Sequence, residues 1–433
     1  MNFLLEKAVL NIQRGSFFRR LYEYTFLRMI ANSERRVFKK QKALLSKQLH
    51  YSIKHCLWYS KITPDKQLNI TSFPLLSRGD VISHNQELCS DIISHLSYGV
   101  GYTGGSTGVP LKVFVSGGYE GDFGRKRWGY YGYQKSDIIL ACDGAKLPEK
   151  DVEKGVFWYK KNRDDIPFGS WGISSLYFTD DNAKQYCQFI KELRPAYLRG
   201  YPSFIYSIVC YAELHNIRIG DSIKAVELTS ESAYSYQIEK IKHVLNAKVF
   251  LQYGHTESCV CAYTFDESYR YRCEPLYGYV EVLDKDGHHV KEGEVGEVVV
   301  TSLYNRAMPL IRYQTGDYAE YGGKDDRYFY LNRVLGRTQD YIINRKGNKV
   351  LLTALIFGQH AKAMEHIRKW QIEQFRKGEM VLSIVKGEGY SSNDENELNN
   401  LFEQLGDIST SFNYVDEIPL TPRGKSKMIV QHL

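Results

Sequence analysis

A glycine-rich stretch, YGVGYTGGSTGVPLKVFVS, is the first segment whose residue types suit ligand binding. Gly99, Gly101 and Gly104 match the G-x-G-x-x-G pattern of dinucleotide-binding loops, which must follow a strand and open a helix. Here Pro110 and the alternating run LKVFVS come next, and they favour a strand. We therefore expect a loop between two strands at residues 103–108. Its N–H groups and hydroxyls would either cradle phosphate or form a plain hairpin loop.

Three other polar segments follow strand-like or loop-like runs further along the chain. QYGHTES comes after the apolar run KVFL, and ligands bind beyond the carboxyl ends of strands in α/β sheets. IRYQTGDY places Asp317 after a Thr-Gly turn, and RGKSK supplies cations around Lys425. Each segment also has a structural interpretation, in which its tyrosine is a core residue, Asp317 a turn residue and Lys425 a solvated charge.

The eight cysteines include a group whose residue types suit a metal. Cys259, Cys261 and Cys273 cluster in the sequence with His255 close by, and these are the ligands of a Cys3His zinc site. Their spacing is not a standard one, and cysteines on neighbouring strands also cluster by chance. Zinc at these four residues is therefore one hypothesis, and a buried, reduced cluster is the one that we favour.

The composition is that of a globular protein rather than a membrane-spanning or nucleic-acid-binding one. The chain has 433 residues, 43% of them hydrophobic, and this length is enough for two or three domains. The net charge of +7 is compatible with an anionic ligand but comes without a nucleic-acid-binding signature. No apolar run approaches the ~18 residues of a membrane span, and the N-terminus lacks a signal-peptide core. We expect a cytoplasmic protein whose basic segment 14–47 forms an amphipathic helix, with weak contact to an anionic membrane surface as the alternative.

The order of the predicted elements indicates an α/β fold. Strand-like and helix-like runs alternate from about residue 99 to 335, as in layered α/β domains, and Asp286-Gly287 predicts a hairpin in a more antiparallel, barrel-like part. We predict a large domain at residues 1–335, beginning with a helical lead-in at 1–60. A small, mobile α+β domain at 336–433 would carry the basic segment around Lys425.

The polar segments together resemble those of the adenylate-forming (acyl-adenylate) ligases, in particular the phenylacetate–CoA ligase branch that includes CapK-like capsule-biosynthesis proteins. YTGGSTGVPLKV resembles the family's phosphate loop, QYGHTES its Tyr-Gly-x-Thr-Glu motif, and RYQTGD its Tyr-Arg-Thr-Gly-Asp motif. LGRTQDYI resembles the hinge segment and LTPRGKSKM the C-terminal lysine loop. The resemblance runs from about residue 45 to the end. Gln314 stands where the family usually has Arg, and Val109 where Lys is common.

The resemblance implies a role for each matching residue. Lys425 would bridge the α-phosphate and the carboxylate, Glu257 would bind Mg²⁺, and Thr256 would contact the α-phosphate. Tyr253 would stack near adenine, with Asp317 accepting both ribose hydroxyls. The remaining residues expected to bind the nucleotide are Thr103, Gly104, Gly105, Ser106, Thr107, Gly108, Glu231, Gly254 and Arg337.

The implied reaction is adenylation of a small carboxylic acid by ATP and Mg²⁺, with release of pyrophosphate. A second step would transfer the acyl group to CoA or another acceptor. One alternative is activation of the acid for attachment to a surface polysaccharide or lipid carrier without CoA. An NAD-binding oxidoreductase and a degenerate nucleotide-binding scaffold are disfavoured alternatives of other classes. Tyr201, Phe204 and Tyr206 would line the acid pocket.

Metal analysis of protein purified without chelator distinguishes the two hypotheses for the cysteine cluster. We expect no stoichiometric zinc. Near-stoichiometric zinc that disappears in a Cys261→Ser/Cys273→Ser variant would show a zinc site instead. Its affinity should then fall at low pH, because the ligand thiolates must be deprotonated. Adenylation that survives loss of the zinc would make the site structural rather than catalytic.

Overall fold

The structure is a computed structural model, and its contacts divide the chain into two compact units. The first unit comprises Met1–Gly132 and Gln252–Val334, and the second comprises Tyr133–Leu251 and Leu335–Leu433. The division into a large domain at residues 1–335 and a small domain at 336–433 stays a prediction. No described helix combines the length and the apolar character that a bilayer span needs. The structure describes residues 37–61, 68–103, 111–116, 120–165, 169–337, 341–351 and 362–433.

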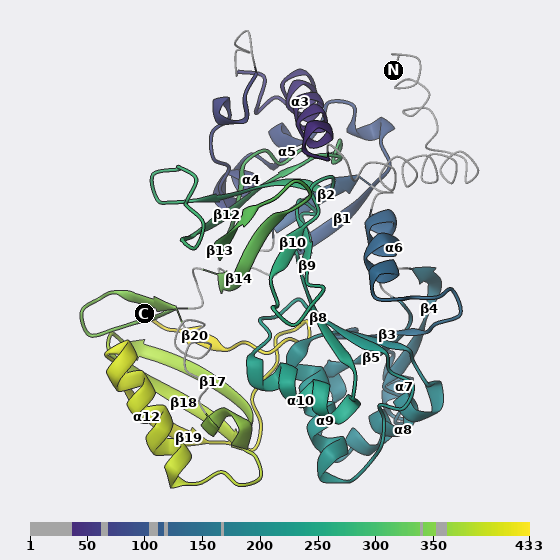
Figure 1. Cartoon of the computed structure of the whole chain (residues 1–433), viewed down its shortest axis with the longest axis vertical. Helices are drawn as coiled ribbons and strands as arrows, with labels where there is room; N and C mark the ends of the chain where they lie inside the picture. Colours follow the sequence, from purple (N-terminus) through teal and green to yellow (C-terminus); the bar gives the residue numbers. More distant parts are fainter. Residues whose placement is uncertain are drawn as a thin grey trace. The chain divides into compact units, whose positions relative to one another are not determined.

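The first unit is mainly antiparallel sheet (Figure 1). Its strands follow the order β11-β12-β13-β14-β10-β9-β8, and β12 is buried along Val298, Val299 and Val300. The expected hairpin at Asp286-Gly287 is confirmed by the antiparallel pairing of β11 with β12. The strands are β8 (Lys248–Gly254), β9 (Cys261–Tyr263), β10 (Tyr271–Cys273), β11 (Gly278–Leu283), β12 (Val295–Ser302), β13 (Tyr313–Lys324) and β14 (Phe329–Arg337). Strand β8 enters this unit at Gln252, and β14 leaves it after Val334.

The helices of the first unit precede this sheet in the chain. Ser77 caps helix α4 in a reciprocal capping box with Asp80, as S-x-x-D before an apolar turn predicts. Helix α3 lies in the described part of the predicted helical lead-in. The helices are α3 (Val37–His55), η2 (Ile70–Ser72), α4 (Arg78–Ser83), α5 (Asn85–Leu88), η3 (Ile93–His95) and α6 (Glu120–Tyr130).

The second unit contains a mostly parallel sheet with the order β7-β6-β3-β5-β4. β3 pairs in parallel with β5 and β6, and β6 with β7, so their carboxyl ends lie at one edge. Helix α8 buries Ala183, Tyr186, Cys187 and Ile190, the spacing of one helix face. The elements are β3 (Ile139–Asp143), α7 (Glu149–Val152), β4 (Trp158–Asp165), β5 (Gly169–Ser174), η4 (Ser175–Tyr177), α8 (Ala183–Leu193), β6 (Tyr197–Gly200), α9 (Pro202–Leu214), β7 (Ala225–Thr229) and α10 (Ser235–Leu245).

The C-terminal part of the second unit has a four-stranded sheet, β19-β18-β17-β20, against which α12 packs (Figure 1). Gly347-Asn348 lies in the turn between β15 and β16, as a Gly-Asn pair between two strand-like runs predicts. The sequence also predicts a helix at 353–366, and its described end, Lys362–His366, is a 3-10 turn. The elements are β15 (Tyr341–Ile343), β16 (Lys349–Leu351), η5 (Lys362–His366), β17 (Ile367–Arg376), β18 (Glu379–Lys386), α12 (Ser392–Gly406), β19 (Ser409–Tyr414) and β20 (Ile429–Gln431). The mixed α/β fold class predicted from the sequence is confirmed.

A separate two-stranded hairpin flanks the glycine-rich loop. Strand β1 (Tyr98–Thr103) pairs antiparallel with β2 (Leu111–Ser116), and Thr103 lies opposite Leu111. Two of the three glycines in the dinucleotide-like pattern are therefore paired strand residues, and a strand follows the loop. Neither feature fits a dinucleotide-binding loop, which opens a helix.

Gly101 lets the hairpin approach the segment after β8. A Cβ added at Gly101 would lie 2.6 Å from Thr256 Cγ2 and 3.2 Å from Val113 Cγ2, closer than packed atoms tolerate. The absence of a side chain at this position therefore brings β1 against Thr256.

We predict that Gly101→Ala destabilises the protein by about 1 kcal/mol, because the added methyl overpacks this contact and the Thr256 methyl must rotate away. Gly99→Ala is the matched control, since nothing lies within 4 Å of its Cβ position. Both variants lose glycine in the same strand, so the backbone contribution cancels. Urea unfolding measures the difference, and equal free energies of unfolding would contradict the predicted contact.

Candidate functional site

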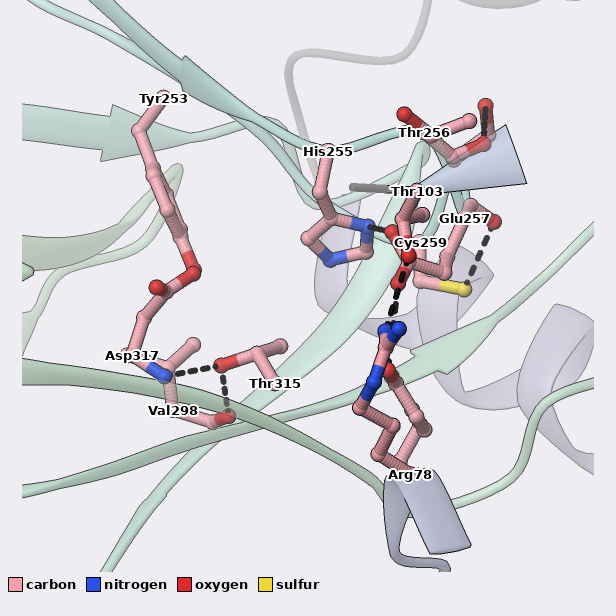
Figure 2. A network of polar contacts seen from close by, with 12 residues as sticks. Arg78, Thr103, Tyr253, His255, Thr256, Glu257, Cys259, Val298, Thr315 and Asp317 are labelled. Atoms are coloured by element: carbon pink, nitrogen blue, oxygen red, sulfur yellow. Dashed lines mark hydrogen bonds and ion pairs between the residues drawn. The ribbon is translucent and has the colours of Figure 1, made fainter. Parts of the chain in front are cut away.

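Thr103 ends β1 at the start of the glycine-rich loop and is held by an arginine. The Arg78 guanidinium, in the first turn of α4, donates from Nη1 to Thr103 Oγ1 at 2.9 Å (Figure 2). A cation therefore lies where the predicted phosphate loop begins. The remaining predicted loop residues, Gly104, Gly105, Ser106, Thr107 and Gly108, lie outside the described residues.

The predicted Tyr-Gly-x-Thr-Glu motif forms the end of β8 and the turn after it. The turn closes where Ser258 N donates to the carbonyl oxygen of His255 at 3.0 Å, with Ser258 at a positive φ of 54°. It buries the Glu257 side chain, whose Oε1 accepts from the Tyr313 hydroxyl at 3.1 Å. A buried carboxylate is stable only with such donors.

Asp317 is positioned by a bulge in β13. Glu297 pairs with Tyr318 and Val299 with Gln314, so residues 315–317 lie opposite Val298 alone. Gly316 takes a positive φ of 74° there. Such bulges re-aim side chains beside functional sites.

Hydrogen bonds lock the bulge and join Asp317 to the end of β8. Thr315 Oγ1 donates to the Val298 carbonyl at 2.7 Å and accepts from Asp317 N at 3.0 Å. The Tyr253 hydroxyl then donates to Asp317 Oδ2 at 2.8 Å, as Figure 2 shows. The structure therefore brings together Tyr253 and Asp317, two residues that the sequence placed in different motifs.

The cysteine group has a different environment at each thiol. Cys259 Sγ contacts the Glu257 carbonyl at 3.2 Å, and Cys261 Sγ lies 3.6 Å from Arg127 Nη1. Burial raises the pKa of Cys273 far above that of a free thiol. His255 Nδ1 lies 3.1 Å from Glu257 Oε2. Among the described residues, no three His, Cys, Asp or Glu side chains are arranged to hold a metal ion, and the absence of zinc stays a prediction for metal analysis.

Lys425 lies in the second unit, on a loop that we call the lysine loop (Thr421–Ser426). Gly424, at a positive φ of 70°, allows the turn in which Gly424 N donates to Thr421 O at 2.8 Å and Thr421 N to Lys425 O at 2.9 Å. The Lys425 amine donates to the Ser230 carbonyl at 2.9 Å and lies 5.4 Å from the centre of the Tyr201 ring. Burial raises the pKa of Tyr201 to about 12, so its ring stays neutral beside the ammonium.

Glu231 is beside the lysine loop, just after β7. Its Oε1 accepts from Ser426 N at 2.8 Å, and its Oε2 accepts from the Ser203 hydroxyl at 2.7 Å. Burial raises the pKa of Glu231, and the hydrogen bonds from Ser203 and Ser426 oppose that rise. The described contacts therefore tie this carboxylate to the lysine loop.

Sequence reasoning missed Arg78, Tyr313, Ser203 and Ser426. Arg78 follows the helix cap in LLSRGD, and a cation in the first helical turn there was an available signal. The other three are hydroxyl or backbone donors, and nothing in their local sequence marks them. Arg337, which was expected at the ribose, is the last residue of β14, and its side chain is not among those described.

The sequence is similar to CapK and to phenylacetate-coenzyme A ligases. The family model described as "CapK C-terminal domain" matches residues 342–432. The protein CapK of Staphylococcus aureus is 24% identical over 429 residues, which cover 92% of this chain and 90% of CapK. Phenylacetate-coenzyme A ligase of Thermus thermophilus is 41% identical over 73 residues, only 16% of either chain.

A solved structure shares the fold over nearly the whole chain. A 2-hydroxyisobutyryl-CoA ligase in the postadenylation state superposes with a TM-score of 0.72 at 14% identity, covering 92% of this chain and 91% of that enzyme. At that identity the likeness establishes the fold alone. These similarities support the resemblance to the adenylate-forming ligases, in the phenylacetate–CoA ligase branch that includes the CapK-like proteins.

Proposed function

We propose that this protein is an acid–thiol ligase that adenylates a carboxylic acid with ATP and transfers the acyl group to CoA or another acceptor. The observation that carries the proposal is the arrangement in the first unit, where a bulge and a strand end join Asp317 to Tyr253 while Glu257 is buried in the adjacent turn. Tyr253 and Asp317, to which the resemblance assigns the nucleoside, are thus joined by a hydrogen bond, and Glu257 is held by its own bond from Tyr313.

The first step forms a bond between a substrate carboxylate oxygen and the α-phosphorus of ATP, and the bond to pyrophosphate breaks. Charge develops on the phosphate oxygens, so positioning and fixed donors dominate the catalysis. Thr256 would contact the α-phosphate, and Arg78 would add a cation through Thr103 at the start of the glycine-rich loop. Lys425 would offset the charge at the reacting oxygens.

In the second step the acceptor attacks the acyl carbon and AMP leaves with the bonding electron pair. For a thiol acceptor such as CoA, the sulfur loses its proton and a thioester forms. The 2-hydroxyisobutyryl-CoA ligase whose fold this chain shares has been solved with its acyl-AMP and CoA. We propose the same order of steps here, with the small domain carrying Lys425 moving between them.

The residues present fit Mg²⁺ as a partner of ATP rather than as a resident ion. Mg²⁺ in nucleotide sites is held by one or two carboxylates together with phosphate oxygens and waters. Glu257 offers one buried carboxylate, and no larger metal-binding group occurs among the described residues. Glu257 would therefore hold Mg²⁺ only alongside the phosphates, whose charge the ion would neutralise.

A second candidate function differs in the acceptor. The match to the CapK C-terminal domain and the similarity to CapK along the chain favour activation of an acid for attachment to a surface polysaccharide or lipid carrier. Both candidates share the first step. Pyrophosphate release with ATP, Mg²⁺ and a panel of acids tests that step. Acyl transfer from the isolated adenylate to CoA then separates the two candidates.

We predict that Lys425→Ala abolishes adenylate formation with little change in stability. The side chain is half-buried and its amine makes a hydrogen bond to one backbone carbonyl, so its loss should cost no more than about 1 kcal/mol. Lys427→Ala is the matched control, because Lys427 is an exposed lysine two residues away. Pyrophosphate release and thermal unfolding measure the two effects. Adenylation by Lys425→Ala at the parent rate would refute the role of Lys425.

We predict that Asp317→Ala weakens ATP binding strongly, because each charge-assisted bond to a ribose hydroxyl contributes about 1.5 to 3 kcal/mol. Asp326→Ala, at an exposed position near the end of the same strand, is the control. The wild type should also bind 2′-deoxy-ATP more weakly than ATP, by about tenfold or more. Calorimetric titration with both nucleotides decides the matter, and equal affinities would mean that Asp317 does not bind the ribose.

A further inference from the structure

The lysine loop is held in the second unit mainly through its backbone. The Tyr201 hydroxyl donates to the Arg423 carbonyl at 3.2 Å, and Ser175 Oγ donates to the Gly424 carbonyl at 2.7 Å. Ser426 N donates to Glu231 Oε1 at 2.8 Å. Of these three bonds, only the one to Glu231 has a carboxyl group as its partner, and hydrogen bonds to an ionised carboxylate are about twice as strong as neutral ones.

Glu231 is itself fixed by the start of helix α9. Its second carboxylate oxygen accepts from the Ser203 hydroxyl at 2.7 Å and from Ser203 N at 3.3 Å. Ser203 lies in the first turn of α9, where backbone N–H groups have no partner within the helix. The carboxylate therefore bridges a helix end to the lysine loop, with an oxygen for each.

The docked loop meets the parallel sheet with almost no clearance. A Cβ added at Gly144, just after β3, would lie 1.8 Å from the Arg423 carbonyl oxygen. A Cβ added at Gly424 would lie 2.2 Å from Ser175 Oγ. Because backbone meets backbone here, this docked arrangement of the loop tolerates little displacement.

We propose that Glu231 is the docking acceptor of the lysine loop, a positioning residue that places Lys425 for adenylation by holding the backbone of its neighbour Ser426. The inference rests on the proposed function for the role of Lys425. A lysine side chain has several rotatable bonds, so its amine is localised only when its backbone is fixed. The Lys425 amine is held by the carbonyl of Ser230, a non-glycine residue at a φ of 73°. Backbone conformations of this kind persist where the surrounding structure enforces them, often at functional sites.

Limited trypsin digestion tests the docking without any need for enzymatic activity. Trypsin cleaves after Arg423 only when the loop leaves its docked position, and cleavage after Lys285 in the exposed turn following β11 serves as the internal reference. We expect Glu231→Ala to speed cleavage after Arg423 by roughly 10-fold or more, which corresponds to the loss of one charge-assisted hydrogen bond. Glu239→Ala, at an exposed glutamate on α10, should cleave as the wild type does. Equal rates in all three proteins would overturn the proposal.

A conservative variant and a kinetic measurement separate docking from nucleotide binding. Glu231→Gln keeps an oxygen that can accept from Ser426, so its cleavage rate should lie between those of wild type and Glu231→Ala. It also reports on the contact if the alanine variant does not fold. In adenylation assays Glu231→Ala should lower kcat and leave KM for ATP unchanged. A raised KM for ATP with unchanged trypsin cleavage would mean that Glu231 binds the nucleotide and does not dock the loop. If the protein adenylates no acid, the digestion still decides the docking proposal.

Discussion

The carboxylates of the two units depend on hydrogen-bond donors: Asp317 and Glu257 are buried in the first unit, Glu231 is half-buried in the second, and a hydroxyl group donates to each. Burying an ionised carboxylate costs several kcal/mol unless hydrogen bonds replace its hydration. Asp317 accepts from the Tyr253 hydroxyl, Glu257 from that of Tyr313 and Glu231 from that of Ser203. A hydroxyl group donates one proton to one carboxylate oxygen, so each carboxylate keeps further acceptor capacity for other donors.

Small residues and local backbone distortions place these groups. A bulge in β13, with Gly316 at positive φ, turns Asp317 out of the regular strand alternation. Gly101 brings the hairpin of the glycine-rich loop against Thr256, and Gly144 allows the lysine loop to dock. At Gly101 and Gly144 the missing side chain allows another segment of the chain to approach closely. Replacement of Gly101 or Gly144 by alanine would therefore displace the neighbouring segment without removing any polar side chain.

The sequence was most informative where local chemistry acts over a few residues. The cap at Ser77, the turns at Asp286-Gly287 and Gly347-Asn348, and the strand LKVFVS after the glycine-rich loop were all predicted, because each depends on neighbours in the chain. A strand after the helix that became α12 was also expected, but without bounds or a partner strand. SFNY alternates weakly, and its place beside β18 comes from a parallel pairing about thirty residues away in sequence.

By itself the sequence determined the motifs and their order, and hence the resemblance to a family, because residue types at fixed spacing reflect the chemistry they serve. Only the tertiary structure decided which of those residues meet. Tyr253 and Asp317 are 64 residues apart and Glu231 and Ser426 are 195 apart, yet each pair shares a hydrogen bond. Such pairings depend on strand order, on a bulge and on glycine contacts between distant segments. A hydrogen bond across so long a separation leaves no local periodicity in the sequence, and the fold alone brings its two ends together.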